Sequence, residues 1–348
     1  MGIKRSVSMY SLQDEYVRGK MNLEAMFKEL KSLGADLEFI TDQMMHNSPF
    51  PREETLQEWD RLIEKYQVKP MCNDIFINTT LYKNRVLTDW EATDLLIHEI
   101  KLANRLGFPV VRLVSETPAE IIEPALKYAE KYNVVLALEI HAGMSFDNPK
   151  TKAFTDIMFR LNSKYLGLVV DTGIFCRRHP RVSKNYFLEL GLNPEVAEYI
   201  DNIFAKGTDP IRYIGDGFYT GGEHGPKYPK DLVKLLKSHV DREYCLFSCG
   251  YENSDLSILD KYLPYIVHFH GKIYEMTEAG EYSIDFEEII AYLSKKNWSG
   301  YISTEYEGNR FALQGQDVDA LSHVRRHQKL LKDLIEKYEN KAGENNVW

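Results

Sequence analysis

The sequence of 348 residues lacks the features that mark thiolate-metal, secreted and membrane proteins. It has only four cysteines, and because none forms a CxxC pair, a zinc-thiolate or thioredoxin-type site is not predicted. Few, scattered cysteines in a large chain are typical of a reducing compartment, and we expect a cytoplasmic protein. No apolar run is long enough to span a membrane, and the first residues lack the apolar core of a signal peptide.

The chain also has a deficit of basic residues. Lys and Arg number 43 against 52 Asp and Glu, which gives a net charge of −9. An acidic balance argues against general binding to nucleic acid or to an anionic membrane, so neither partner is expected.

Two common site motifs are absent as well. No GxGxxG follows the first predicted strand, which disfavours a dinucleotide-binding sheet. His98-Glu99 is not followed by a second histidine at the spacing of a zinc protease.

Strand-like and helix-like segments alternate along most of the chain. The predicted strands are 4–12, 36–42, 70–78, 110–115, 134–141, 166–172, 265–273 and 301–305. The predicted helices are 23–33, 53–66, 88–106, 118–132, 152–161, 231–240, 286–295 and 320–338. Repeated βα units imply right-handed crossovers and a parallel sheet. We therefore predict a (β/α)8 TIM barrel, with an open doubly wound sheet as the alternative.

The barrel is predicted to be a single domain over residues 1–340, followed by a frayed tail over 341–348. The stretch 176–263, between the sixth and seventh strands, is longer than an ordinary connection. It contains a polar, glycine-rich run with Tyr219 and His224 that could close over a site as a lid.

Four predicted strands deliver an acid or an imidazole at their C-terminal ends. The segments LALEIHAG, LGLVVDTG, IVHFHGK and YISTEYEG carry Glu139, Asp171, His270 and Glu305. The C-terminal ends of barrel strands meet at one mouth, where three carboxylates would repel one another. A divalent cation removes that repulsion and supplies a Lewis acid, so we predict a metal site with these four ligands. Taken alone, each acid could instead cap a helix or pair with an arginine.

The ligand types restrict the metal. Oxygen and imidazole donors without thiolate favour Mn²⁺ or Mg²⁺, with Zn²⁺, Co²⁺ and Fe²⁺ as further candidates. His268 shares a strand face with His270, and His270 is preferred as the ligand because it lies nearer the strand end.

Two residues beside the predicted ligands are candidates for catalysis. His141 lies two positions after Glu139 and therefore on the same strand face, where a neutral imidazole could act as a base. It could also be a fifth ligand or a hydrogen-bonding partner of one. Lys272 could stabilise a developing oxyanion, or could be a surface lysine.

Several other polar residues have open roles. One of Asn73 and Asp74 is expected to point into the barrel, because their side chains lie on opposite faces of a strand. The basic run after the sixth strand could face substrate oxygens, face a partner subunit or be solvated: Arg177, Arg178, His179 and Arg181.

The ordered set Glu139, Asp171, His270 and Glu305 resembles the sugar isomerase and epimerase superfamily, the xylose isomerase-like TIM barrels. The resemblance extends over almost the whole chain, and in that superfamily these positions hold the metal.

More closely, the chain resembles the catalytic α subunits of bacterial C-glycoside deglycosidases. The segments that carry this resemblance are YSLQDEY, NDIFINTTLYKNR, LEIHAGMSFD, VVDTGIFCRRHPRVS and HFHGKIYE. It implies a Mn²⁺-dependent complex with a small β subunit, a 3-oxo-glucoside substrate, and cleavage of the carbon–carbon bond to a flavonoid aglycone. The base of that family matches His141.

The implied reaction is chemically consistent. A 3-oxo group acidifies the C2 proton, and removal of that proton by His141 gives an enolate that expels the aglycone by β-elimination, leaving an unsaturated keto sugar. The aglycone carbon must be protonated, by His141 or by a water at the metal. The alternative activities with the same enolate chemistry are a metal-dependent ketose 3-epimerase or isomerase and a keto-inositol dehydratase.

Overall fold

The centre of the molecule is a closed barrel of parallel strands, which confirms the predicted TIM barrel over the open sheet. The computed structural model describes residues 2–77, 79–80, 84–115, 117–208 and 228–344. Around the ring the strands follow the order β1-β10-β7-β6-β5-β4-β3-β2. Their bounds are β1 Lys4–Ser8, β2 Asp36–Ile40, β3 Pro70–Ile75, β4 Val110–Leu113, β5 Val135–Ile140, β6 Leu166–Asp171, β7 Ile266–Ile273 and β10 Tyr301–Tyr306.

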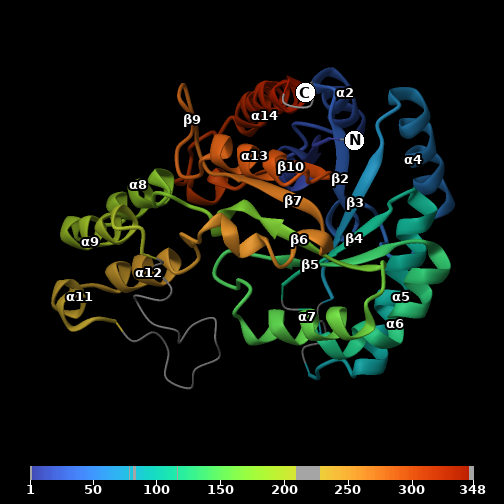
Figure 1. Cartoon of the computed structure of the whole chain (residues 1–348), viewed down its shortest axis with the longest axis horizontal. Helices are drawn as coiled ribbons and strands as arrows, with labels where there is room; N and C mark the ends of the chain where they lie inside the picture. Colours follow the sequence, from blue (N-terminus) through green and yellow to red (C-terminus); the bar gives the residue numbers. More distant parts are fainter. Residues whose placement is uncertain (1, 78, 81–83, 116, 209–227, 345–348) are drawn as a thin grey trace.

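Helices cover the outside of the barrel (Figure 1). Those that follow the barrel strands are α2 Leu23–Leu33, α4 Glu53–Tyr66, α5 Asp89–Leu106, α6 Ile122–Tyr132, α7 Pro149–Leu161, α13 Phe286–Lys295 and α14 Ala320–Glu344. Their ends agree with the capping signals in the sequence. Helix α5 begins with a capping box between Thr88 and Glu91 and ends at Gly107, whose φ of 88° few other residues adopt.

The first two strands are shorter than predicted, because their last residues turn into short helices. After β1 the chain forms the 3₁₀ helix η1 (Met9–Leu12), and the Ser11 hydroxyl fixes this turn by donating to the Thr304 carbonyl. After β2 it forms α3 (Thr41–Met44). There the Thr41 amide donates a hydrogen bond to the side-chain oxygen of Asn73 instead of to a backbone carbonyl of a neighbouring strand.

The largest differences from the predicted helices are at two places. The segment 231–240 is not one helix: α11 (Lys230–Leu235) ends, and α12 (His239–Ser248) begins at a new capping box made by Ser238 and Asp241. Helix α14 continues to Glu344, beyond the predicted end at residue 338. Since residues 345–348 lie outside the described residues, the frayed tail stays a prediction.

A long insertion separates β6 from β7, as predicted. It contains η3 Thr172–Ile174, α8 Arg181–Glu189, α9 Pro194–Ala205, α11, α12, η4 Leu256–Leu259 and η5 Leu263–Tyr265. Its larger helices lie together on one side of the barrel (Figure 1). The predicted lid residues Tyr219 and His224 lie outside the described residues.

A small hairpin after β7, made of β8 (Met276–Thr277) and β9 (Gly280–Glu281), was not predicted. Its strands are too short to show a hydrophobic period. The Glu281 carboxylate holds it by accepting hydrogen bonds from four backbone amides, those of Tyr274, Glu275, Ser283 and Ile284.

The barrel interior changes character along its axis. At one level it is filled by a small apolar cluster composed of Met71, Cys72, Val110, Ala137 and Val169. Toward the C-terminal ends of the strands the inward positions become polar. The strand register places Asp171 beside His270, and His270 beside Ser303. Parallel pairing therefore brings residues far apart in sequence to one layer of the mouth.

Two features of the structure bear on the predicted absence of thiolate-metal sites and of membrane spans. All four cysteines are buried and free. Among the described residues, no helix has the length and hydrophobicity that a membrane span requires.

Candidate active site

The four predicted metal ligands all lie at the C-terminal half of the barrel and are buried. Glu139 comes from β5, Asp171 is the last residue of β6, His270 is on β7 and Glu305 is on β10. Each is at most 2% exposed. Because the strands are neighbours in the ring, these side chains converge from one half of the barrel.

His270 is the centre of the group. Its Nδ1 lies 2.7 Å from a carboxylate oxygen of Glu139 and 3.3 Å from one of Glu305. One donor atom from each of these three residues lies within 4.8 Å of the others. Burial alone would lower the pKa of His270, but the surrounding carboxylates of Glu305, Glu38 and Glu139 outweigh burial and raise this pKa well above its ordinary value.

Asp171 lies beside this group rather than within it. Its Oδ1 accepts a hydrogen bond of 2.7 Å from the Gly173 amide. Its Oδ2 lies 3.3 Å from Nζ of Lys272 and 3.7 Å from Nε2 of His141. The structure thus joins three of the four predicted ligands directly and connects the fourth through Lys272.

Lys272 is not a surface lysine, because it is only 1% exposed. Its Nζ lies 2.7 Å from Glu305 and 2.9 Å from Glu307, in addition to its contact with Asp171. Burial would lower the pKa of Lys272, but these three carboxylates outweigh burial and raise this pKa well above its ordinary value. The side chain is therefore a fixed positive charge in the middle of an acidic cluster.

His141 is the accessible member of the site, with 32% of its side chain exposed. Its Nδ1 lies 2.7 Å from the carbonyl oxygen of Ala142. Since a carbonyl can only accept, Nδ1 carries the hydrogen and, in the neutral ring, Nε2 has the free lone pair. That basic nitrogen is the one that faces Asp171, which suits a base beside the ligand group.

Glu252, from the insertion, holds the turn that follows His141. Its carboxylate accepts a hydrogen bond of 2.6 Å from the Gly143 amide. The insertion therefore contributes directly to the position of the candidate base.

Besides Glu252, the sequence analysis missed three charged neighbours of the site: Glu38, Arg112 and Glu307. Arg112 Nε lies 3.4 Å from Asp74 and 3.8 Å from Glu139. A usable signal was present, since Glu38 and Arg112 are charged residues inside apolar strands, and Glu307 follows Glu305 on the same face.

Of the two candidates in β3, Asp74 points into the barrel toward Arg112. Burial and the carboxylate of Glu38 raise the pKa of Asp74 well above its ordinary value, against the effect of Arg112. Asn73 faces the other way and caps α3.

The site fits a divalent cation. Although Lys272 lies near both, Asp171 Oδ2 and Glu305 Oε2 are buried and form no hydrogen bond in the described part of the chain. The donor set consists of carboxylate oxygens and imidazole nitrogen, the ligands of Mn²⁺, Mg²⁺ and catalytic Zn²⁺. Glu139 is ready to ligate, because Arg112 and His270 outweigh the effect of burial and hold the pKa of its carboxyl well below the ordinary value.

His268 has different neighbours from His270, and the choice of His270 as the ligand stays a prediction. His268 lies one layer deeper and forms its hydrogen bond with Glu38, at 2.6 Å. It is not among the donors around Glu139 and Glu305.

The basic residues after β6 mostly form contacts with other residues of this chain. Arg177 pairs with Glu288, and Arg181 pairs with Glu275. His179 is buried against the hydroxyl groups of Tyr244 and Ser248. Arg178 stacks on the ring of Tyr282. These contacts argue against a merely solvated loop.

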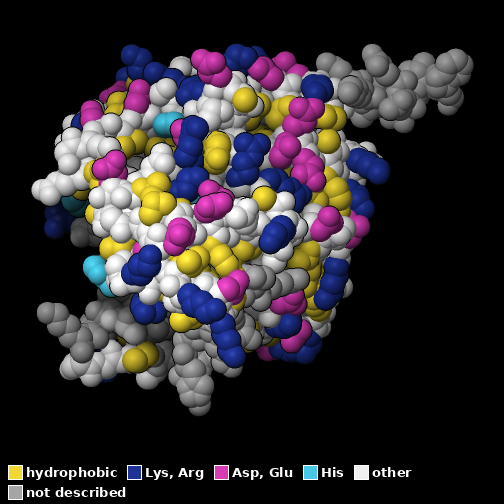
Figure 2. Space-filling model, turned by 90° about the vertical axis from the view of Figure 1, so that its left-hand side faces the viewer, with side chains coloured by type: hydrophobic (Ala, Val, Ile, Leu, Met, Phe, Trp, Pro, Cys, Tyr) yellow, Lys and Arg dark blue, Asp and Glu magenta, His cyan; other side chains and the backbone are white. Residues whose placement is uncertain are grey.

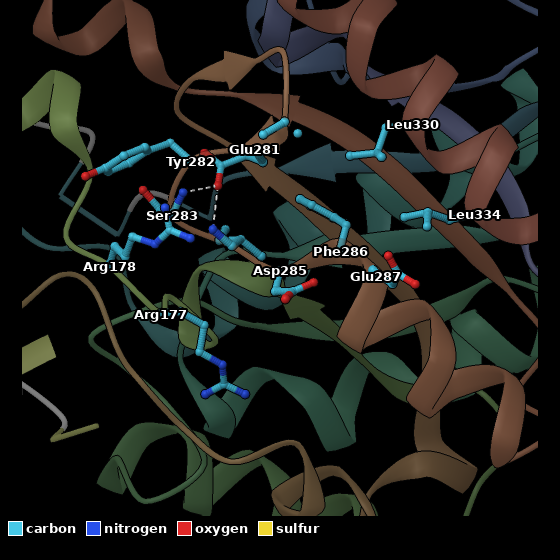
Figure 3. A pocket seen from close by; sticks show the side chains of 13 residues that line it. Arg177, Arg178, Glu281, Tyr282, Ser283, Asp285, Phe286, Glu287, Leu330 and Leu334 are labelled. Carbon is cyan, nitrogen blue, oxygen red and sulfur yellow. Dashed lines mark hydrogen bonds between the residues drawn. The ribbon is translucent and has the colours of Figure 1, made fainter. Parts of the chain in front are cut away.

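A cavity of about 270 Å³ lies beside this run, between the hairpin β8–β9 and α14 (Figure 3). Arg178, Tyr282, Phe286 and Leu330 are among its lining residues, and Arg177 extends away from Glu281. None of the predicted site residues lines this cavity. It is therefore separate from the ligand group at the mouth.

The chain was compared with known proteins. The sequence profile of a family described as xylose isomerase-like TIM barrel matches residues 27–214. A C-glycoside deglycosidase alpha subunit of Arthrobacter globiformis is 26% identical over 96% of this chain and 93% of its own. A 3'-dehydrocarminate deglycosidase alpha subunit of Microbacterium sp. is 25% identical over 97% of both chains.

Among solved structures, L-ribulose 3-epimerase superposes with a TM-score of 0.55 at 11% identity, covering 99% of this chain and 98% of its own. This similarity supports the fold. The family profile covers more than half of the chain, and the curated relatives are those that the sequence motifs indicated. The chain therefore belongs to the xylose isomerase-like TIM barrel family and has C-glycoside deglycosidase alpha subunits among its relatives.

Proposed function

We propose that this protein is a metal-dependent lyase that cleaves the C–C glycosidic bond of 3-oxo-C-glucosyl aromatic compounds, including flavonoids. The observation that carries the proposal is the buried group Glu139, His270 and Glu305 with an accessible histidine, His141, at its edge. The deglycosidase names of the two relatives supply the substrate class.

We propose Glu139, Asp171, His270 and Glu305 as the ligands of one divalent cation, most simply Mn²⁺. When bound, the cation supplies a Lewis acid for the 3-oxo group of the sugar. Lys272 keeps its proton among three carboxylates, so it adds a fixed positive charge that stabilises the oxyanion developing on the substrate.

His141 acts as the base. The free lone pair on Nε2 removes the proton from C2 of the 3-oxo-glucosyl unit, and the C–H electrons form an enolate. The enolate then forms the C1–C2 double bond as the bond from C1 to the aglycone breaks. The protonated His141 is positioned to return its proton to the departing aryl carbon, which completes release of the aglycone and an unsaturated keto sugar.

Among the described residues of the site, His141 is the one accessible base, and this favours elimination over epimerisation. An epimerase must remove a proton from one face of the sugar and add one from the other, which requires two acid–base groups. His141 offers proton transfer from one side, whereas Glu139, Glu305, His268 and His270 are each at most 2% exposed.

Both relatives are named alpha subunits, and we propose that this chain likewise works with a second, small β subunit in the cytoplasm. Binding to nucleic acid is not expected. Figure 2 shows basic and acidic side chains interspersed on the face that carries the insertion, rather than one basic patch.

The test is turnover of a 3-oxo-C-glucosyl flavonoid by Mn²⁺-loaded protein, with and without EDTA and a candidate β subunit. We expect free aglycone, and we expect EDTA to abolish its release. If no aglycone forms even with the β subunit, the lyase proposal is wrong, and free ketoses and keto-inositols become the substrates to screen.

A further inference from the structure

A second acid–imidazole pair lies directly beneath the ligand group. Glu38, on β2, reaches across the barrel to β7, although β1 and β10 lie between these strands in the ring. Its Oε1 lies 2.6 Å from Nε2 of His270, and its Oε2 lies 2.6 Å from Nε2 of His268. All three side chains are completely buried.

The two nitrogens of His270 thus face two different groups. Nδ1 faces Glu139 and Glu305, whereas Nε2 faces Glu38. A neutral imidazole has one N–H and one lone pair, and a carboxylate oxygen can only accept a hydrogen. Both nitrogens therefore face carboxylates, and Nδ1 is hydrogen-bonded to Glu139. Once a cation replaces the hydrogen of Nδ1, the neutral ring keeps its hydrogen on Nε2, toward the Glu38 carboxylate.

Contacts at both ends hold the carboxylate of Glu38 in a fixed orientation. One oxygen is held by His268 and the other faces His270, so the side chain contacts an imidazole at each end. Its backbone is held in the barrel between Ser8 on β1 and Cys72 on β3. A carboxylate held in this way limits rotation of the His270 ring as well as the position of its hydrogen.

We infer that Glu38 is a positioning residue that orients His270 and selects the tautomer in which Nδ1 binds the metal. The inference rests on the proposed metal site. Outer carboxylates that accept the second N–H of a metal-binding histidine raise its basicity, and their loss typically weakens metal binding about 10–100-fold.

The experiment measures Mn²⁺ affinity directly, without substrate, by titration of apo-protein. Glu38→Gln keeps the size of the side chain but removes its charge, and we expect affinity to fall about 10–100-fold. Glu99→Gln is the matched control, since it makes the same substitution at a buried carboxyl on α5, outside the ligand group. We expect this control to bind Mn²⁺ about as tightly as the wild type.

The outcomes are distinct. If the wild type binds no Mn²⁺, the proposed metal site itself is wrong. If the wild type binds and folded Glu38→Gln binds equally well, the inference about Glu38 is wrong, while the metal site stands. A fall in affinity of the same size in Glu99→Gln would mean that loss of any buried carboxyl, rather than of the contact with His270, is responsible.

A second measurement does not depend on any variant folding. In a crystal of the wild-type protein soaked with Mn²⁺, anomalous scattering locates the ion. We expect the ion at Nδ1 of His270, with Nε2 still facing Glu38. An ion at Nε2, or Glu38 itself as a ligand, would overturn the inference.

Discussion

Replacement of Glu99 by Gln should make the protein more stable, and increasingly so as the pH rises. Glu99 lies on α5 with 3% of its surface exposed, and its Oε2 is buried without a hydrogen bond among the described residues. Burial and the nearby carboxylate of Asp42 raise its pKa from 4.5 to about 8. The folded protein therefore retains a proton at Glu99 over a range in which the unfolded chain has lost it.

The sign and size follow from proton linkage. Above about pH 4.5 the unfolded state binds fewer protons at Glu99 than the folded state does. The contribution of Glu99 to the free energy of unfolding is therefore complete below pH 4.5 and is lost as the pH rises toward 8. The free energy of unfolding of the wild type falls through this group by up to about 1.4 kcal/mol per pH unit. Gln has no proton to lose, so from pH 5 to pH 7 the free energy of unfolding of Glu99→Gln should rise relative to the wild type by up to roughly 3 kcal/mol.

Urea unfolding at pH 5, 6, 7 and 8 measures this difference. The control is Glu64→Gln, which removes an exposed carboxylate from the neighbouring helix α4. Stability curves for Glu99→Gln and the wild type that run parallel with pH would refute the reasoning. A divergence of the same size in Glu64→Gln would show that net charge, rather than burial, is its cause.

The remaining predictions concern the site. His141→Ala should bind Mn²⁺ normally but lose about 10²–10⁴-fold in turnover, and near-normal turnover would disprove the assignment of the base. Lys272→Met leaves three buried carboxylates without their cation, so the free energy of unfolding in urea should fall by about 3–5 kcal/mol, and added Mn²⁺ should restore part of it. EDTA treatment should lower the melting temperature and abolish aglycone release, with recovery on Mn²⁺ addition; release that persists in EDTA would exclude a metal role.

The barrel and the places of the predicted ligands could be inferred from the sequence because both depend on local signals. A run of apolar residues ending in Glu139 or Asp171 and then glycine reports a buried strand with a polar end. Parallel pairing of the strands then places these polar ends together at one mouth of the barrel. His270 was predicted as the ligand rather than His268 because it lies nearer the C-terminal end of its strand.

The contacts across the barrel could not be inferred in this way. Whether Lys272 is exposed or buried depends on Asp171, Glu305 and Glu307, which come from other strands or from the end of β10. Glu38 is distant from His270 by 232 positions in the numbering of the chain, and two strands, β1 and β10, lie between their strands in the ring. The hairpin β8–β9 was missed for a different reason, since its stability comes from one carboxylate, Glu281, rather than from a periodic pattern.

The register of β6 and β7 has a consequence for how such enzymes can diversify. Asp171 and His270 are direct neighbours across these two strands, yet the whole insertion lies between them in the chain. The insertion leaves the barrel after Asp171 and re-enters at Ile266, which pairs with Leu168. The bridge Phe175–Asn253 joins the beginning and the end of the insertion, and Cys176–Ile284 joins its beginning to the segment after β9. Evolution can therefore vary most of this segment, and with it what approaches the site, while the paired strands keep Asp171 and His270 together. The part that cannot vary freely is Glu252, which holds the turn after His141.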